Sequence, residues 1–212
     1  MTVSLPSADC HNCFTQALVA VGSNVSSASG PPEATVAEAV AELARRAGQT
    51  LRVSRFFRNP AFPAGSGPDF VNAALALDWT GSAEDLLDIL HRIEADFGRT
   101  RRQRWAARVL DLDLLALGDT VLPDAATQDR WREIPADTAA QAAPDRIIVP
   151  HPRLQERGFV LVPLADIAPD WRHPRTGQSV SAMLSALPPD ALCEIVPIAG
   201  SLPLSIPHVA DK

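Results

Sequence analysis

The sequence predicts an α+β fold, in which helices pack on the faces of a mainly antiparallel sheet. Two observations lead to this class. Short apolar or alternating runs, typical of strands, occur between segments whose apolar residues recur at helical spacing. The helices also follow the strands too closely for a large doubly wound sheet. At 212 residues the chain can bury one substantial core, so we expect a single domain.

The first elements follow the order strand, helix, strand, strand. Residues 17–21 form a short apolar run that ends at a Gly-Ser-Asn turn, which indicates a strand. Apolar residues at helical spacing predict a helix over residues 33–47, followed by a glycine. Residues 50–57 alternate as a strand does, and the Pro- and Gly-rich residues 59–69 predict a loop. Residues 70–79 then indicate another strand. One face would carry Phe70, Asn72, Ala74 and Ala76, and the other Val71, Ala73, Leu75 and Leu77.

The next segment is the clearest helix in the sequence. Ser82 and Asp85 have the spacing of a capping pair, and an apolar stripe follows until Gly98. The arginine-rich residues 99–108 are expected to form a loop, and residues 109–116 a strand that carries two aspartates. The helix and this strand complete the strand–helix–strand–strand–helix–strand order of a ferredoxin-like sandwich, a fold that serves many unrelated functions.

The second half of the chain is less regular. Residues 118–146 are polar and weakly periodic, and a loop of this length is unusual, so we expect this insertion to hold a short helix or to be partly mobile. Order resumes over residues 146–171. Residues 179–187 predict a last helix, and residues 193–198 predict a last strand.

Composition is that of an ordinary globular protein, with 46% hydrophobic and 21% charged residues. No apolar run is long enough to span a bilayer, and the first residues lack the basic start and apolar core of a signal peptide. We therefore expect a cytoplasmic protein without a membrane partner. Residues 1–16 should form a flexible N-terminal tail, residues 17–198 the functional domain, and residues 199–212 a C-terminal tail.

The cysteines do not predict a disulfide framework, because the chain has three of them. Cys10 and Cys13 form a C-x-x-C motif around His11, but no second pair completes a zinc site. We interpret this motif as part of the mobile tail rather than as a metal or redox site.

Positive charge is concentrated in one short stretch of an acidic protein. The net charge of −6 disfavours a general nucleic-acid binder. Five arginines nevertheless fall within ten residues: Arg99, Arg101, Arg102, Arg104 and Arg108. Guanidinium groups form forked hydrogen bonds with phosphate oxygens, so this stretch suits a compact, highly charged anion.

Two aspartates interrupt the apolar strand that follows. In a strand, Leu110, Leu112 and Leu114 can share one face, while Asp111 and Asp113 share the other. Neighbouring carboxylates repel each other unless positive charge lies nearby, which could come from the arginines, a metal ion, or both. A carboxylate pair suits Mg²⁺, which prefers oxygen ligands and fills its other positions with water and substrate phosphates.

The D-x-D pattern alone is weak, because it also occurs on solvated strands and turns. The same groups could serve a nucleotidyltransferase or an ordinary kinase. A third interpretation is an RNA-binding module that uses residues 99–108, with Trp105 either stacked on a base or packed against the core. Paired aspartates would repel RNA phosphates, which disfavours this interpretation.

Four segments carry a more specific resemblance. In order and in approximate spacing, "VAVGSN", "NPAFPAGSGPDFVNAAL", "HRIEADFGRTRRQRWAARVLDLDLL" and "VPHPRLQERGFVLVPLADIAP" resemble the hydroxymethyldihydropterin pyrophosphokinases of folate biosynthesis. The resemblance begins near Ala17 and extends to the last strand. Its most distinctive part is the combination of the arginine cluster, the tryptophan and the L-D-L-D strand.

The resemblance implies a monomer that transfers pyrophosphate from ATP to 6-hydroxymethyl-7,8-dihydropterin and releases AMP. It implies that Asp111 and Asp113 hold two Mg²⁺ ions, and that Arg99 and Arg108 assist the transfer. The implied pterin contacts are the rings of Phe70 and Phe159, the amide of Asn72, and backbone groups at Ala61 and Phe62. The implied ATP contacts are His91, Glu94, Arg101, Arg104, Trp105, Leu114, His151 and Arg157.

The chain departs from the family pattern at three places. Ala106-Ala107 replaces the usual Gly-Pro in the arginine-rich loop, which bears on the flexibility of a loop expected to close over the substrates. Asn59-Pro60-Ala61 stands where the family usually has Thr-Pro-Pro or Thr-x-Pro. Phe70 occupies a position where tyrosine is common, and stacking does not need the hydroxyl.

Overall fold

The computed structural model describes residues 14–61, 65, 67–98, 109–135, 144–201 and 203–207. Within these ranges its centre is a seven-stranded sheet in which each paired strand runs antiparallel to its neighbours. The neighbours follow the order β5-β1-β4-β2-β7, and β3 joins β4 to β6. The strands are β1 (Thr15–Ser23), β2 (Leu51–Val53), β3 (Phe57–Asn59), β4 (Phe70–Trp79), β5 (Asp111–Leu117), β6 (Val196–Pro197) and β7 (Leu204–Ile206).

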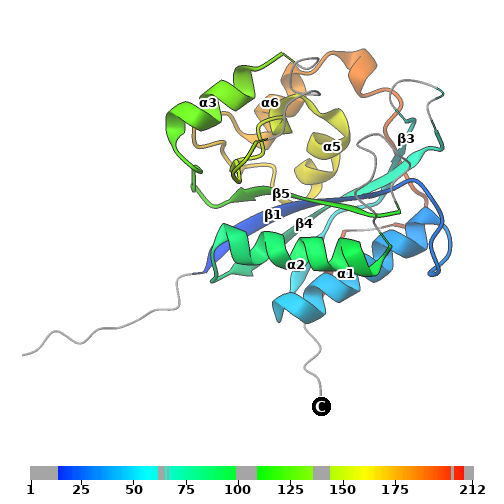
Figure 1. The fold of residues 1–212 in the computed structure, drawn as a ribbon. Coiled ribbons are helices and arrows are strands. Elements are labelled where there is room, and N and C mark those ends of the chain that lie inside the picture. Colours follow the sequence, from blue (N-terminus) through cyan, green and yellow to red (C-terminus); the bar gives the residue numbers. More distant parts are fainter. Residues whose placement is uncertain are drawn as a thin grey trace, which may run out of the picture.

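Helices cover both faces of this sheet (Figure 1). The elements α1 and α2 lie on one face, and α5 and α6 lie on the other, with α3 beside them. The bounds are α1 (Pro32–Ala47), α2 (Ala83–Asp96), α3 (Ala125–Glu133), α5 (Gly158–Ile167) and α6 (Val180–Ala186), with short 3₁₀ turns at η1 (Leu154–Glu156) and η2 (Pro189–Ala191). The predicted α+β class is therefore confirmed, and the spatial order β5-β1-β4-β2 is that of a ferredoxin-like sheet.

Two apolar cores fill the spaces between the sheet and its helix layers. The core under α1 and α2 contains Leu110, Leu112 and Leu114, as the strand pattern predicts. The core under α5 and α6 contains Ala74 and Ala76 of β4, which alternate with the larger residues of the first core. The central strands are apolar on both faces because helices exclude water from both. The two aspartates of β5 consequently point toward the α5 side.

The helix ends agree with the capping signals of the sequence. Ser82 accepts a hydrogen bond from the backbone of Asp85, whose carboxylate accepts one from the backbone N–H of Ser82, so the predicted capping box is formed. Gly48 follows α1 with φ of 62°, a left-handed conformation that glycine adopts without a steric penalty.

The strand predicted over residues 50–57 is interrupted. It divides into β2 and β3 at Ser54. The backbone N–H of Ser54 still donates to the Ala74 carbonyl at 2.9 Å, but the Ala74 N–H donates to the Ser54 hydroxyl, also at 2.9 Å, instead of to a backbone carbonyl. The backbone N–H of Arg55 instead donates to Asp166 of α5, at 3.1 Å. A side chain that takes over a backbone hydrogen bond between two strands interrupts their regular pairing. The periodicity of the residues does not predict such a bond.

Three other segments differ from expectation, and the insertion at residues 118–146 agrees with it. The Asp-bearing strand begins at Asp111 rather than at residue 109, and only Val196–Pro197 of the predicted last strand is extended in the sheet. Leu204–Ile206, within the predicted C-terminal tail, form β7 against β2. The insertion at residues 118–146 does contain a helix, α3.

Two further observations concern what the described residues lack. None of their helices combines the length and apolar character that a membrane crossing requires. The C-x-x-C motif at Cys10 and Cys13 lies outside the described residues, and Cys193 is a free, exposed thiol.

Candidate active site

The strand register brings polar side chains of β5 and β4 into one row on the α5 face, with a glycine of β1 between them. Asp111 of β5 lies opposite Gly22 of β1, and Gly22 lies opposite Asn72 of β4. Directly paired residues point to the same side of a sheet, so Asp111 and Asn72 share a face with the glycine between them. Residues separated by almost 40 positions in sequence therefore lie on one surface.

Asp111 and Asp113 form the acidic end of this row. Both are partly exposed, and both point away from the core under α1 and α2. Arg157 approaches from the segment before α5, with its Nη1 atom 3.7 Å from Oδ2 of Asp113. That separation is an ion pair but exceeds hydrogen-bonding distance. The Arg157 guanidinium also lies 5.7 Å from the ring centroid of Phe159.

His151 enters the site from the edge of β5. Its backbone N–H donates to the carbonyl of Leu115 at 2.8 Å, and the ring Nδ1 accepts the Arg153 N–H at 3.1 Å. Part of the residue reaches the surface, but the ring is desolvated by surrounding protein atoms. This desolvation, with the positive charge of Arg157, lowers the pKa of His151 to about 3, although Asp111 opposes the shift.

The protonation of His151 follows from these contacts. At physiological pH the imidazole is neutral, because its pKa lies far below that range. Since Nδ1 accepts a hydrogen bond, the single ring proton is on Nε2. His151 can therefore donate a hydrogen bond to an anion without itself adding a charge.

Among the described residues predicted to bind the pterin, Phe70 and Asn72 lie at the start of β4, where it pairs with β3. Phe70 starts β4 on the face of Asn72, and Phe159 is 38% exposed at the start of α5. Asn72 is only 8% exposed, and its Nδ2 atom donates to Oδ1 of Asn59 at 2.6 Å. Ala61 is buried beside this strand pair. An exposed ring together with a nearly buried amide can bind a flat polar heterocycle.

Glu94 and Leu114 have clear packing roles. Glu94 is 2% exposed, and its Oε1 atom accepts the backbone N–H of Leu112 at 2.8 Å. This bond attaches α2 to the outer edge of β5 and so helps to hold the aspartates of that strand. Leu114 is buried in the core under α1 and α2. The ATP contacts predicted for both residues stay predictions.

His91 lies on a separate hollow at the β5 edge. The hollow has a volume of about 490 Å³ and combines apolar with charged side chains. Its lining comprises Glu84, Leu87, Asp88, His91, Leu122, Pro123, Arg146 and Ile147. Because α2 packs against β5, this hollow is close to the strand that carries the aspartates.

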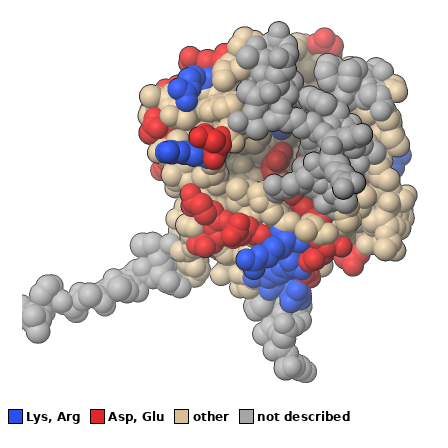
Figure 2. Space-filling model, viewed as in Figure 1, with Lys and Arg blue, Asp and Glu red and all other residues tan. Residues whose placement is uncertain are grey.

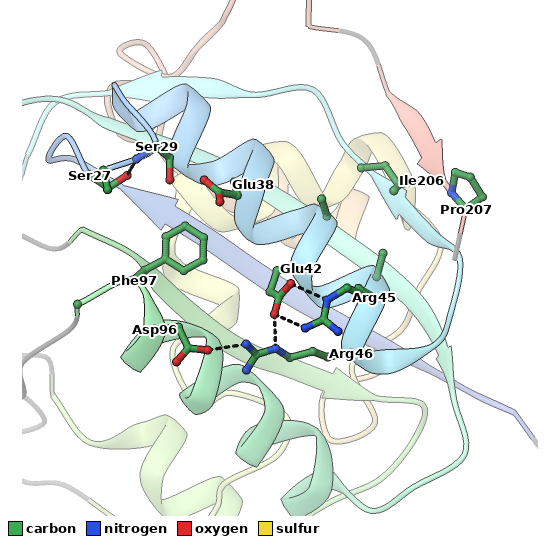
Figure 3. Close-up of a pocket in the computed structure, with 14 residues that line it drawn as sticks. Ser27, Ser29, Glu38, Glu42, Arg45, Arg46, Asp96, Phe97, Ile206 and Pro207 are labelled. Atoms are coloured by element: carbon green, nitrogen blue, oxygen red, sulfur yellow. Dashed lines mark hydrogen bonds and ion pairs between the residues drawn. The ribbon is translucent and has the colours of Figure 1, made fainter. Parts of the chain in front are cut away.

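A larger hollow of about 850 Å³ lies within the layer of α1 and α2, between α1, the end of α2 and β7 (Figure 3). Its charged side chains neutralise one another. Glu42 binds both Arg45 and Arg46, and Arg46 also binds Asp96 of α2. These bonds join α1 to α2. We do not assign the active site to this hollow, because it is on the opposite side of the sheet from Asp111.

Figure 2 shows the molecule hollowed between its two helix layers, with acidic side chains in the hollow and on the layer below it. Several predicted site residues lie outside the described residues: Phe62, Arg99, Arg101, Arg104, Trp105 and Arg108. Their roles therefore stay predictions. Asp111 and Asp113 place two carboxylates beside Arg157, and paired carboxylates need further positive charge nearby before such a site can accept phosphates.

Three structural contributors carry no clear signal in the sequence. Gly22 leaves room between Asp111 and Asn72, and the Asn59 side chain binds Asn72. Gln128 of α3 is fully buried and donates to the Pro150 carbonyl at 3.3 Å, next to His151. The long insertion thus supports the segment that carries His151. A glycine after an apolar run could have suggested a close approach, but nothing in the sequence pairs Gln128 with residue 150.

Comparison with known proteins gives a consistent result. A family model described as 7,8-dihydro-6-hydroxymethylpterin-pyrophosphokinase (HPPK) matches residues 18–169. A 2-amino-4-hydroxy-6-hydroxymethyldihydropteridine pyrophosphokinase of Synechocystis is 36% identical over 91% of this chain and 86% of its own length. One of Methylorubrum extorquens is 34% identical over 84% of this chain and 98% of its own length.

Solved structures with the same fold include a Plasmodium falciparum HPPK-DHPS, with a TM-score of 0.58 at 10% identity. The match covers 84% of this chain but only 45% of that one. Another HPPK-DHPS, crystallised in complex with substrates, has a TM-score of 0.57 at 12% identity, over 82% of this chain and 43% of that one. At such low identity these matches concern the fold alone. The sequence matches show that the chain belongs to the 7,8-dihydro-6-hydroxymethylpterin-pyrophosphokinase family.

Proposed function

We propose that this pyrophosphokinase transfers pyrophosphate from ATP to the hydroxymethyl oxygen of 6-hydroxymethyl-7,8-dihydropterin. The observation that carries the proposal is the single row on the α5 face, where the carboxylate of Asp111 and the amide of Asn72 lie on either side of Gly22. Phosphate-directed and heterocycle-directed groups therefore share one surface, as a reaction between ATP and a pterin requires.

Asp111 and Asp113 are the groups that we propose hold two Mg²⁺ ions. Within the described ranges, no cluster of three or more His, Cys, Asp or Glu side chains is arranged to hold a metal. Two carboxylates nevertheless suit Mg²⁺, which usually takes one or two from the protein and completes its shell with water and substrate phosphates. When bound, Mg²⁺ would neutralise phosphate charge next to these carboxylates.

ATP would lie along the edge of β5. The neutral His151 would donate its Nε2 proton to a phosphate oxygen, and Arg157 would pair with phosphate charge. The hollow that His91 lines has apolar walls suited to the flat base of the nucleotide. We propose that Arg99, Arg101, Arg104, Trp105 and Arg108 complete this site.

The pterin would occupy the other end of the row. Its ring would stack between Phe70 and Phe159, and its polar edge would bind the Asn72 amide and the backbone near Ala61. Phe159 is exposed enough to accept a planar ligand. The buried amide favours a heterocycle with hydrogen-bonding groups, because an apolar ring would leave the amide unsatisfied.

The transfer then has a simple balance. The hydroxymethyl oxygen forms a bond to the β-phosphorus of ATP while the bond from that phosphorus to the α,β-bridging oxygen breaks. The pterin diphosphate and AMP are the products, and the hydroxyl proton is released. The residues of this chain contribute by orienting the two substrates and offsetting charge, which supplies much of the catalysis in phosphoryl transfer.

The nucleotide product tests this proposal directly. The protein would be incubated with ATP, Mg²⁺ and reduced 6-hydroxymethylpterin, and the nucleotides separated by chromatography. We expect AMP to accumulate in step with pterin diphosphate, and only when pterin is present. ADP would indicate a simple kinase, and pyrophosphate a nucleotidyltransferase. Either product, or no turnover by folded protein, would contradict the proposal.

A further inference from the structure

Two asparagine side chains form a hydrogen-bonded pair at the pterin end of the row. Nδ2 of Asn72 donates to Oδ1 of Asn59 at 2.6 Å, between the neighbouring strands β4 and β3. Nδ2 of Asn59 in turn donates to the carbonyl of Pro60 at 2.9 Å. The two amides therefore form a short chain that begins at a backbone carbonyl.

This chain has only one favourable polarity. A carbonyl oxygen can only accept, so Pro60 requires the NH₂ group of Asn59. The oxygen of Asn59 then faces Asn72 and requires its NH₂ group. If the Asn72 amide rotated by half a turn, two carbonyl oxygens would face each other. The backbone of Pro60 thus sets the orientation of a side chain that it does not touch.

Gly22 makes the other side of this arrangement possible. A Cβ atom at residue 22 would lie 2.5 Å from Oδ1 of Asn72, closer than such atoms approach in proteins. The Asn72 amide therefore extends from Asn59 of β3 on one side to Gly22 of β1 on the other. Its oxygen points toward β1, on whose far side Asp111 lies.

We propose that Asn59 is a positioning residue, which acts through Asn72 and makes its amide oxygen the group presented on the sheet surface. This inference rests on the proposed function, because the oriented Asn72 amide is taken to be a group that binds the pterin. An oxygen in that position selects a ring edge that offers an N–H donor. The threonine common at this position in the family has a hydroxyl that can both donate and accept, so it would impose no fixed polarity.

The main test is a double-mutant cycle. Asn59→Leu removes the acceptor at nearly constant shape, whereas Asn59→Asp keeps an acceptor facing Asn72. Dissociation constants for the pterin and for a non-hydrolysable ATP analogue would be measured by calorimetry. We expect Asn59→Leu to weaken pterin binding about tenfold, as loss of an oriented hydrogen bond does. Asn59→Asp keeps an acceptor for Asn72 but loses the donor to the Pro60 carbonyl, so it should weaken pterin binding less than Asn59→Leu does. The ATP analogue should bind equally well in both variants.

The cycle is closed in an Asn72→Leu background. In that background Asn59→Leu should change pterin binding by less than about twofold, because the Asn72 amide that Asn59 orients is no longer present. A tenfold loss that persists in this background would mean that Asn59 acts directly or through its loop, and would overturn the proposal. Equal loss with Asn59→Asp and Asn59→Leu would also overturn it.

A second readout needs no substrate. In the free protein, the side-chain NH₂ signals of Asn72 can be followed by ¹⁵N NMR with solvent exchange. Asn59→Leu should speed this exchange, and Asn59→Asp should not. Unchanged exchange in Asn59→Leu would refute the positioning role even if pterin binds. Conversely, a wild-type protein that binds no pterin but shows the expected exchange would refute the proposed function alone.

Gly22→Ala provides an independent perturbation. The added methyl group should displace the amide oxygen and weaken pterin binding about tenfold, while an Asn72→Ala background should remove most of this effect. An effect of the same size in both backgrounds would contradict the assigned contact.

Discussion

Two charged regions of this protein, the hollow between α1 and α2 and the surface beside β5, contain the same types of side chain but arrange them differently. Between α1 and α2, Arg45 binds Glu42 with two hydrogen bonds of 2.9 Å and 2.7 Å, and Arg46 binds the same carboxylate. Beside β5, Arg157 remains 3.7 Å from Asp113. In the first region the carboxylate and the guanidinium groups are joined by short hydrogen bonds, whereas in the second the contact between Arg157 and Asp113 is a longer ion pair.

Secondary structure explains much of this difference. On a helix, residues three and four apart are neighbours, so Glu42 meets both Arg45 and Arg46 within its own element. On a strand the period is two, so Asp111 and Asp113 place like charges side by side. Their positive partners must come from elsewhere in the fold or from a ligand. The strand is therefore suited to binding, and the helix pair to stability.

The largest expected effect follows from neutralising the strand carboxylates. Asp111→Asn and Asp113→Asn should each lower turnover about a thousandfold, because several kcal/mol of charge stabilisation would be lost. Thermal unfolding should change little, since both side chains are partly exposed. Steady-state AMP formation measures the first effect, and calorimetry the second. Asp119→Asn, on the exposed turn after β5, is the matched control. Near-normal turnover in both Asp111→Asn and Asp113→Asn would contradict the assignment of the strand carboxylates to the metal and phosphate site.

The next effect is the dependence of protein stability on pH that arises from His151, beside β5. The pKa of His151 is about 3 in the folded protein but ordinary, near 6.5, in the unfolded chain, so the unfolded chain binds more protons between these values. The stability of neutral His151 is thus fully present above pH 6.5 and is lost as pH falls below it. We expect a loss of about 3 kcal/mol by pH 4 in denaturant unfolding. His151→Asn, which keeps an acceptor for Arg153, should flatten this slope, and an unchanged slope would contradict the assignment.

A smaller effect concerns the aromatic end of the row. Phe159→Ala should weaken pterin binding about tenfold, from lost stacking and buried area, and should affect ATP binding less. Titration calorimetry with each substrate measures both constants. Phe14 is an exposed ring immediately before β1, at the opposite end of that strand from Gly22. Phe14→Ala should therefore change neither dissociation constant. Equal losses for pterin and ATP would count against a ring sandwich.

The smallest effect is expected in the hollow between α1 and α2. Hydrogen bonds from Arg45, with further contributions from Arg46, lower the pKa of Glu42 to about 2. The stabilisation by ionised Glu42 is therefore present above its ordinary pKa and is lost as pH falls toward 2. Glu42→Gln should cost about 1 kcal/mol at pH 7, because the pair is partly exposed, and less near pH 2. Turnover should not change. Glu38→Gln, exposed on the same helix, is the control for unfolding.

Much of the fold could be predicted from local patterns. The capping pair at Ser82, the glycine after α1 and the alternation of the Asp-bearing strand all act within a few residues. The division of strand 50–57 could not be predicted in this way, because it depends on a hydrogen bond between Ser54 and Ala74. Non-local bonds of this kind leave no periodic signal.

The candidate site shows the same division. Residue types alone indicated a metal–phosphate site at Asp111 and Asp113, because neighbouring carboxylates in an apolar strand need compensating charge. Nothing local indicated that α3 would support the His151 segment through Gln128, or that His151 would be neutral. Burial sets that pKa, and burial exists only once distant segments pack together.

By itself, the sequence determined the class of fold, the faces of the strands and the presence of a carboxylate pair, because side-chain period and capping are properties of a single element. Only the tertiary structure decided that Gly22 would separate Asp111 from Asn72, and that Asn59 would orient the Asn72 amide. Strand register and cross-strand hydrogen bonds join residues far apart in the chain, and a shift of one residue would have moved these groups to the other face of the sheet.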